Sequence, residues 1–212
     1  MRSIPAAWRW TFVGLIAVVA LAVALWPRAQ RPGPAASPTA SAQQSDSGVT
    51  AAERAAAALA DCPRPTGAAA AGSLAGITLD CLNDGHPVDL AAALAGRPAL
   101  VNLWAYWCQP CAQELPALQQ FADRAGPAVT VLTVHSDPAE AKALARLHDL
   151  DVHLPGVQDG AAKVRTAVGA PSVLPVSVLV RADGSIAKVI VRPFGNAGDI
   201  AETVAADLGV RV

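Results

Sequence analysis

The pattern of apolar and polar positions changes its period repeatedly along this chain. Apolar or alternating runs typical of strands occur at residues 77–82, 87–90, 98–104, 128–134, 152–154, 176–182 and 185–192. Segments with helical spacing lie before, between and after them, at residues 50–60, 91–95, 109–124, 137–149, 160–168 and from 199 onward. This order predicts an α/β domain whose sheet has helices on both faces.

Local signals mark the starts of three of these helices. Thr50 and Glu53 have the spacing of a capping box. Asp137 followed by Pro138 is typical of an N-cap residue and a proline at the first helical position. Asp199 is expected to cap the last helix.

Two hairpins are predicted. The runs at residues 77–82 and 87–90 are separated by Asn, Asp and Gly, which favour a turn. Asp183 and Gly184 separate the last two strands and form the strongest short hairpin signal in the chain.

An apolar segment stands at the N-terminus. Residues 11–26 are apolar and follow two arginines, and counted from Trp8 the segment is near the roughly 17–25 residues that span a bilayer. We interpret residues 1–26 as an uncleaved single-pass transmembrane helix with the N-terminus inside. A cleaved signal peptide is the alternative, but the A-x-A site at residues 40–42 lies far beyond the apolar run.

The rest of the chain divides into a linker and a folded domain. Residues 27–49 are rich in Pro, Ala and Ser and predict a tether, which leaves residues 50–212 as the domain. The 16 Lys and Arg residues are balanced by 17 Asp and Glu without a basic run, so we expect no nucleic-acid partner. All four cysteines follow the apolar segment, which favours an oxidising compartment outside the cytoplasm. Nothing in the pattern requires more than a monomer.

Cys108 and Cys111 form a C-x-x-C pair between an expected strand and an expected helix. At a helix N-terminus, free N–H groups and the helix dipole favour the thiolate of Cys108. Cys111, one turn inward, is then the resolving thiol, and such a pair suits thiol–disulfide exchange. Half of a zinc site is the alternative, but the chain has no second C-x-x-C or H-x₃₋₅-H segment. We predict a redox-active disulfide, no metal and no bound cofactor.

The segment around this pair resembles a known family. Residues 101–116 read Val-Asn-Leu-Trp-Ala-Tyr-Trp-Cys-Gln-Pro-Cys-Ala-Gln-Glu-Leu-Pro and are similar to the active-site segment of thioredoxin-like proteins, in particular the membrane-anchored TlpA/ResA/DsbE branch. The resemblance runs from about Gly76 to the C-terminus. It implies a thioredoxin-like fold with a central mixed β-sheet flanked by helices. The first hairpin is then an N-terminal extension of that fold.

Glu114 stands three residues after Cys111. A partly buried carboxylate there would have a raised pKa and would take or return the proton of Cys111. A solvated helix glutamate is the alternative, whereas the resemblance implies a functional glutamate at this C-x-x-C-x-x-E position. Asn102 takes the position where cytoplasmic thioredoxins have a buried aspartate, and an amide does not accept a proton as a carboxylate does.

Three residues are expected to bind substrate. Leu174 and Pro175 precede an apolar strand, and the resemblance implies that they form the family's cis-proline segment, whose extended backbone pairs with substrate. Pro171 is a second candidate for the cis-proline, because the spacing departs from the family by one residue. Trp107 is expected at the rim of the active site and Trp104 in the core, and packing of both rings in the core is the safer alternative.

Cys62 and Cys81 lie outside the active-site motif. A disulfide between them would tie the first helix to the first hairpin and contribute roughly 3 kcal/mol by the chain-entropy argument. Four cysteines allow three connectivities, and a second redox couple that passes electrons to Cys108 stays an alternative. We favour a structural disulfide, because neither cysteine stands at an activating helix N-terminus.

The predicted function is a thiol–disulfide oxidoreductase at the bacterial cell membrane with an extracytoplasmic catalytic domain. The resemblance favours reduction of disulfides in client proteins, with apocytochrome c as a candidate client and a CcdA/DsbD-like membrane protein as electron donor. The same residues suit an oxidase that donates disulfides to secreted proteins. A non-enzymatic alternative is a copper-binding assembly protein that uses the cysteine pair and His135, although Sco-like copper proteins have a longer C-x₃-C spacing.

Overall fold

The structure is a computed structural model that describes residues 48–65 and 71–212. The expected transmembrane helix at residues 1–26 lies outside the described residues, as does the linker up to residue 47. Within the described ranges, no helix has the length and apolar character needed to cross a membrane. Val49, which the sequence places at the end of the linker, is buried in the core of the domain.

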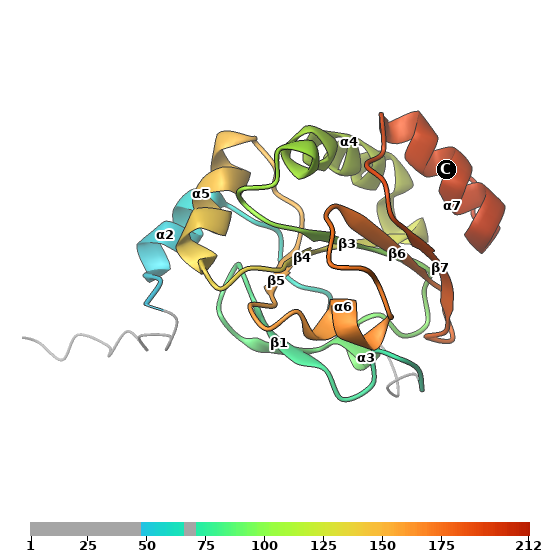
Figure 1. Cartoon of the computed structure of the whole chain (residues 1–212), viewed down its shortest axis with the longest axis horizontal. Helices are drawn as coiled ribbons and strands as arrows, with labels where there is room; N and C mark the ends of the chain where they lie inside the picture. The colour runs from blue at the N-terminus through green and yellow to red at the C-terminus, as the bar shows by residue number, and fades with distance from the viewer. Residues whose placement is uncertain (1–47, 66–70) are drawn as a thin grey trace, which may run out of the picture. The chain divides into compact units, whose positions relative to one another are not determined.

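Seven strands in the described part of the chain form one mixed β-sheet (Figure 1). The strand order is β2-β1-β5-β4-β3-β6-β7, in which the β3–β4 and β4–β5 pairs are parallel and the other neighbours antiparallel. The strands are β1 (Thr78–Cys81), β2 (Pro87–Asp89), β3 (Ala99–Trp104), β4 (Thr130–His135), β5 (Gly156–Gln158), β6 (Val176–Val180) and β7 (Ile186–Ile190). The predicted hairpins are β1–β2 and β6–β7, and the predicted α/β class is confirmed.

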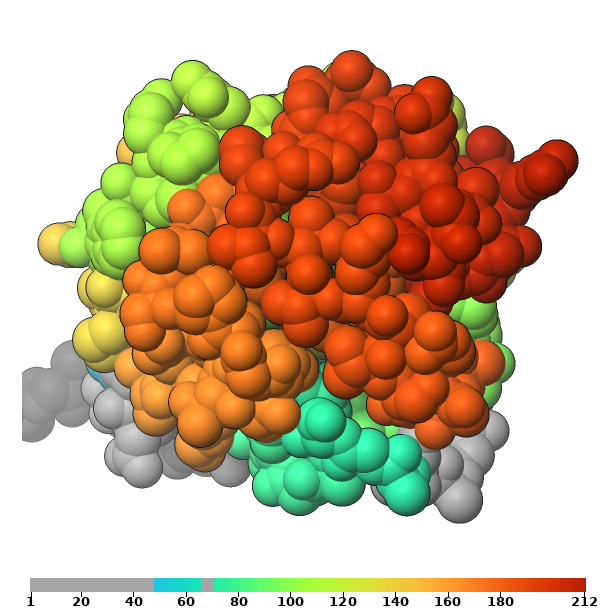
Figure 2. Space-filling model, turned by 45° about the vertical axis from the view of Figure 1, so that its right-hand side comes forward, coloured from blue at the N-terminus to red at the C-terminus, as the bar shows by residue number. Residues whose placement is uncertain are grey.

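Helices cover both faces of the sheet (Figure 1). One buried cluster joins α2, α4, α5 and α7 to one face, and a second joins α3 and α6 to the other. Helix α7 packs beside α4, and Figure 2 shows the surface of the C-terminal segment in red beside the light-green region that contains the start of α4. The helices are α2 (Ala51–Ala57), α3 (Leu90–Ala93), α4 (Gln109–Ala125), α5 (Glu140–Asp149), α6 (Lys163–Ala167) and α7 (Ala197–Leu208).

Strand β3 is buried along its whole length and directs alternate residues to the two faces of the sheet. Leu100 and Trp104 belong to the cluster under α4, whereas Val101 and Leu103 belong to the opposite cluster. Because side chains alternate along a strand, Asn102 points to the same face as Leu100 and Trp104. The alternation thus places an amide beneath α4.

Helix α4 begins immediately after Cys108, which is its N-cap residue. Pro110 lies in the first turn, where a missing N–H costs little. Pro116 lies inside the helix, where it removes the hydrogen bond to the carbonyl of Ala112. The apolar face of the helix is nevertheless buried in the core, through Leu115, Leu118 and Phe121.

Two of the three predicted helix caps are wrong. The capping box of Thr50 and Glu53 is present. Helix α5 begins only at Glu140, because the Asp137 carboxylate accepts the Ala139 N–H at 2.8 Å in a turn before the helix. Helix α7 is capped by Asn196, whose Oδ1 accepts two backbone N–H groups. The Asp199 carboxylate binds an arginine instead.

The strand predicted at residues 152–154 is also wrong. Strand β5 lies beyond it at Gly156–Gln158, where it pairs with β4 and β1. Val152 and Leu154 are apolar because their side chains are buried in the core below α4 and α5. The short apolar run before Pro155 therefore marks buried side chains and not a β-strand.

Candidate active site

Cys108 and Cys111 are joined by a disulfide at the N-terminus of α4. The Sγ atom of Cys108 accepts the backbone N–H of Cys111 at 3.3 Å. Cys111 is fully buried, while Cys108 keeps 5% of its surface exposed. The N–H group and the positive end of the helix dipole both stabilise a thiolate at Cys108 when the disulfide is reduced. The geometry therefore distinguishes an outer, activated sulfur from an inner, enclosed one.

Trp107 stands beside the disulfide with 58% of its surface exposed. Its indole Nε1–H donates to the Asp137 carboxylate at 2.9 Å, which ties the ring to the loop after β4. Burial raises the pKa of Asp137, but the hydrogen bonds from Ala139 and Trp107 outweigh it, so the pKa is lowered overall. Asp137 thus remains an anionic acceptor for the indole. Trp104, by contrast, is fully buried.

Glu114 is a buried residue with 1% of its surface exposed, not a solvated helix glutamate. Its Oε2 accepts from Nδ2 of Asn102 at 2.9 Å, and its Oε1 accepts the backbone N–H of Phe194 at 2.8 Å. Burial raises the pKa of Glu114 to about 7, although these two hydrogen bonds act in the opposite direction. A carboxyl group of this kind exchanges a proton near neutral pH.

The loop between β7 and α7 supplies the Phe194 N–H. In this loop Arg192 makes two hydrogen bonds of 2.7 Å to the Asp199 carboxylate, and its guanidinium lies 5.0 Å from the centre of the Phe194 ring. The positive charge of Arg192 lowers the pKa of Glu114, and the negative charge of Asp199 raises it. The arginine–aspartate pair therefore fixes the loop, and its two charges act on the pKa of Glu114 in opposite directions.

Leu174 and Pro175 immediately precede β6, and the peptide bond between them is cis. Strand β6 runs antiparallel to β3, with Val176 opposite Leu103. The start of β6 therefore lies at the same end of the sheet as the loop that leads from β3 to Cys108. Pro175 is buried and Leu174 half-buried, while Pro171, the other candidate, is exposed.

His135 is buried at the end of β4 and does not join the cysteine pair. Its Nδ1 lies 2.9 Å from Oε1 of Gln158, and its ring centre lies 5.0 Å from that of Trp104. Burial lowers the pKa of His135. Across the residues that the structure describes, no three His, Cys, Asp or Glu side chains are grouped as a metal site.

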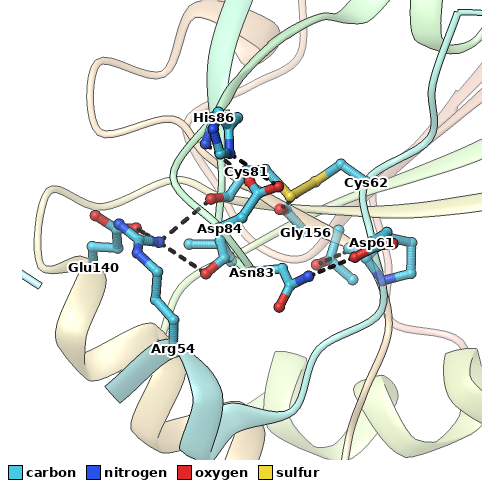
Figure 3. The surroundings of a disulfide bond; sticks show 12 residues. Arg54, Asp61, Cys62, Cys81, Asn83, Asp84, His86, Glu140 and Gly156 are labelled. Atoms are coloured by element: carbon cyan, nitrogen blue, oxygen red, sulfur yellow. Dashed lines mark hydrogen bonds and ion pairs between the residues drawn. A yellow bond between two sulfur atoms is a disulfide. The ribbon is translucent and has the colours of Figure 1, made fainter. Parts of the chain in front are cut away.

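Cys62 and Cys81 form the second disulfide, with their Cα atoms 6.0 Å apart (Figure 3). Cys81 ends β1 and is buried, and Cys62 lies half-buried in the loop after α2. An open cavity of about 500 Å³ adjoins the two sulfurs, with acidic and basic residues in its lining, among them Asp61, Arg64 and Asp84. Neither cysteine occupies the N-terminus of a helix.

Polar contacts around this disulfide fasten the N-terminal segment to the sheet (Figure 3). The Arg54 guanidinium from α2 donates to the carbonyl of Leu82 at 2.8 Å and forms a buried ion pair with Glu140 of α5 at 2.6 Å. Asn83 donates from Nδ2 to the Asp61 carboxylate at 2.8 Å. The disulfide, the ion pair and the hydrogen bonds therefore hold the same segment at three points.

A family model described as Redoxin matches residues 65–206, which is more than half of the chain. The chain belongs to the Redoxin family. It is 27% identical over 101 residues to the thiol-disulfide oxidoreductase ResA of Bacillus cereus, which covers 46% of this chain and 57% of that protein. It is 42% identical over 59 residues to the thiol:disulfide interchange protein DsbE of Pseudomonas fluorescens biotype C, which covers 27% of this chain and 33% of that protein.

A solved structure supports the same assignment. A secreted Mycobacterium tuberculosis disulfide oxidoreductase homologous to E. coli DsbE is 26% identical, with a TM-score of 0.51 over 59% of this chain and 95% of that one. The resemblance to the TlpA/ResA/DsbE proteins and the thioredoxin-like fold are thereby confirmed. The chain spans between a third and just over half of the ResA and DsbE relatives that it matches.

The sequence did not indicate two groups that hold the Asn102–Glu114 pair in place. Ser177 lies on β6 opposite Asn102, and its Oγ is 3.0 Å from Nδ2 of that residue. The Phe194 N–H is a backbone group 80 residues from Glu114 in the chain, and no side-chain type marks it. The sequence of β6 held the one indication of such a group. Ser177 is a polar residue among valines and a leucine, in a strand that is buried throughout.

Proposed function

We propose that this protein is a thiol–disulfide oxidoreductase that works through Cys108 and Cys111. The observation that carries the proposal is the disulfide at the N-terminus of α4, with a backbone N–H directed at the Cys108 sulfur and Cys111 enclosed behind it. An activated outer sulfur and an enclosed inner partner are what two-step exchange requires. The ResA and DsbE relatives carry this activity in their names.

In the reducing direction the exchange takes two steps. The Cys108 thiolate attacks one sulfur of a client disulfide, a mixed disulfide forms, and the other client sulfur leaves as a thiolate. Cys111 then loses its proton and attacks Cys108, which releases the second client thiolate. The client gains two electrons and the enzyme pair loses them. Glu114, as a carboxylate, takes the proton of Cys111 and returns it for the leaving thiolate.

Client binding is assigned to the surface beside the cysteine pair. The exposed Trp107 ring offers an apolar contact, and the backbone at Leu174 and Pro175 offers hydrogen bonds to an extended client segment. The alignment of the β6 start with the end of β3 supports this assignment. Because backbone contacts carry little sequence information, we expect several clients to be accepted.

The second disulfide has a structural role in this proposal. Cys62 and Cys81 join elements that Arg54 and Glu140 also hold, and neither sulfur is activated by a helix N-terminus.

Residues 1–26 are assigned as the membrane anchor and residues 27–49 as the linker of a monomer whose domain at residues 50–212 is extracytoplasmic. Reduction of clients such as apocytochrome c, with a CcdA/DsbD-like electron donor, is the direction that the resemblance favours.

Trapping of the mixed disulfide tests the proposal. The full chain with Cys111→Ser, reduced and mixed with a disulfide-bonded peptide, is expected to accumulate a covalent adduct at Cys108 that mass spectrometry detects. Cys108→Ser is the matched control, because it keeps one thiol of the pair but at the enclosed position. Equal adducts in the two variants, or none in either, would contradict the assignment of Cys108 as nucleophile.

A further inference from the structure

The side-chain amide of Asn102 is hydrogen-bonded at one end only. Its Nδ2 lies 2.9 Å from Oε2 of Glu114 and 3.0 Å from Oγ of Ser177. Its Oδ1 is buried without a hydrogen-bond partner among the described residues. Asn102 is itself fully buried. An amide has a donor end and an acceptor end of nearly equal size, so this site uses the donor end twice and the acceptor end not at all.

The arrangement fits the ionised form of Glu114. A carboxylate only accepts hydrogen bonds, and each of its oxygens here receives one donor. Oε1 receives the backbone N–H of Phe194 at 2.8 Å, which cannot reverse its direction. A proton that binds to Glu114 must therefore sit on Oε2, the oxygen that faces Asn102. With the amide as it stands, that O–H would meet an N–H, and a buried hydrogen bond would be lost.

A half-turn of the amide restores the lost bond. Oδ1 then takes the place of Nδ2 and accepts from the protonated Oε2 of Glu114. Oδ1 also accepts from the Ser177 hydroxyl, which serves as donor or acceptor as required. Two hydrogen bonds exist before and after the turn, and both partners stay where they are. The end of the amide without a partner is the acceptor before the turn and the donor after it.

We propose that Asn102 is a positioning residue whose amide reverses each time Glu114 gains or loses its proton, so that both forms of the carboxyl group are held in one place. The inference rests on the proposed role of Glu114 in proton exchange with Cys111. A carboxyl group that need not move is ready to take the proton of Cys111 and to return it. Aspartate at residue 102 would compete with Glu114 for the proton.

The other groups that face Glu114 do not replace this function. Arg192 and Asp199 act on it from the β7–α7 loop and from α7 with opposite charges, and Cys111 lies one turn back on the same helix. The Phe194 N–H is fixed as a donor. Asn102 and Ser177 are therefore the groups at this carboxyl that change between donor and acceptor. Both forms of Glu114 are populated near neutral pH, because burial raises its pKa to about 7.

NMR of the oxidised full chain in detergent tests the proposal, because the disulfide removes thiol titration from the measurement. Asparagine enriched in the heavy nitrogen isotope gives three side-chain amides, and Asn83 and Asn196 serve as internal controls for Asn102. Between about pH 9 and about pH 5, the Nδ2 protons of Asn102 are expected to lose their hydrogen-bonded shift with the midpoint of the Glu114 carboxyl carbon. Glu114→Gln is expected to abolish this change. Asn102 protons that stay hydrogen-bonded at both ends of the range overturn the proposal.

Asn102→Leu gives a second readout of similar volume. The hydrogen bond from Nδ2 of Asn102, as the amide stands, lowers the pKa of Glu114. An amide that reverses stabilises the protonated form as well, so its removal is expected to leave the pKa of Glu114 nearly unchanged. A fixed amide stabilises only the carboxylate, so its removal would raise that pKa by about one unit or more and contradict the proposal. Ser177→Ala is the matched control, because it leaves the contact between Asn102 and Glu114 in place.

The role of Glu114 is measured separately from the motion of the amide. The pH profile of client reduction by Glu114→Gln reports that role, and the NMR titration does not depend on turnover. An unchanged pH profile with a reversing amide would remove Glu114 from the proposed mechanism and leave the reversal of Asn102 without a role in proton exchange. A changed pH profile with an amide that does not reverse would keep Glu114 in the proposed mechanism and overturn the inference on Asn102.

Discussion

Replacement of Glu114 by Gln is expected to change how the stability of the fold depends on pH. The pKa of Glu114 rises from 4.5 to about 7 on folding, chiefly because the side chain is buried. Below 4.5 the carboxyl is protonated in both states and this burial costs nothing. Between the two values the unfolded state releases its proton first, so the free energy of unfolding falls as pH rises. Above about 7 the loss is complete.

The size of the loss follows from the shift. A difference of about 2.5 units, from 4.5 to about 7, corresponds to about 3 kcal/mol at 1.36 kcal/mol per unit. Gln is close in shape and does not ionise, so the variant lacks this loss. The stability of the variant minus that of the parent is therefore expected to rise by about 3 kcal/mol between about pH 4 and about pH 8.5. Any constant cost of the amide cancels in this difference.

Urea unfolding of the oxidised proteins, followed at several pH values, is the assay. Glu202→Gln is the matched control, because Glu202 is an exposed glutamate on α7. The control difference is expected to stay flat over the same range. A flat difference for Glu114→Gln as well would show that the carboxyl is not held in an unfavourable environment. The argument for a proton acceptor near neutral pH would then fail.

The double variant Cys62→Ser, Cys81→Ser is expected to lose roughly 3 kcal/mol of unfolding free energy and to reduce clients at an unchanged rate. A loss of turnover without a loss of stability would contradict the structural role. Arg54→Met is expected to destabilise the fold by about 3–5 kcal/mol in chemical unfolding, because it leaves the buried Glu140 without its ion pair. The additional change Glu140→Gln is expected to recover part of this loss, and no recovery would argue against the pairing. Trp107→Ala is expected to raise KM for a client peptide more than it lowers kcat in a reduction assay, and an effect on kcat alone would place the ring in the chemistry.

The part of the active site that is local in sequence was open to prediction. A C-x-x-C pair between a strand and a helix predicts a disulfide at the N-terminus of that helix, because a separation of three residues in the first helical turn fixes the distance between the sulfurs. The burial of Trp104 agrees with the expectation, since this residue ends a buried strand. The exposure of Trp107 agrees with a place at the rim and not with core packing, which was the safer interpretation. These features need no knowledge of distant contacts.

The hydrogen bonds of Glu114 and two helix starts were not open to prediction in the same way. Spacing alone left Glu114 between a solvated and a functional side chain, and its burial depends on the β7–α7 loop, which supplies the Phe194 N–H. Asp137 and Asp199 have the residue type of an N-cap, but each carboxylate binds a donor that tertiary structure provides. Propensity identifies what such a side chain is able to do, and packing determines which partner it meets.

The reduction potential of the Cys108–Cys111 pair tests the central claim most directly. The full chain, with Cys62–Cys81 intact, is equilibrated in graded thiol buffers and followed by tryptophan fluorescence, since Trp104 and Trp107 lie just before the pair. Cys108→Ala provides the baseline without a couple. We expect a reversible two-electron transition near the thioredoxin value of roughly −270 mV or lower, whereas a value near about −120 mV would reverse the direction of exchange. The absence of any reversible transition would contradict the assignment of Cys108 and Cys111 as a redox pair.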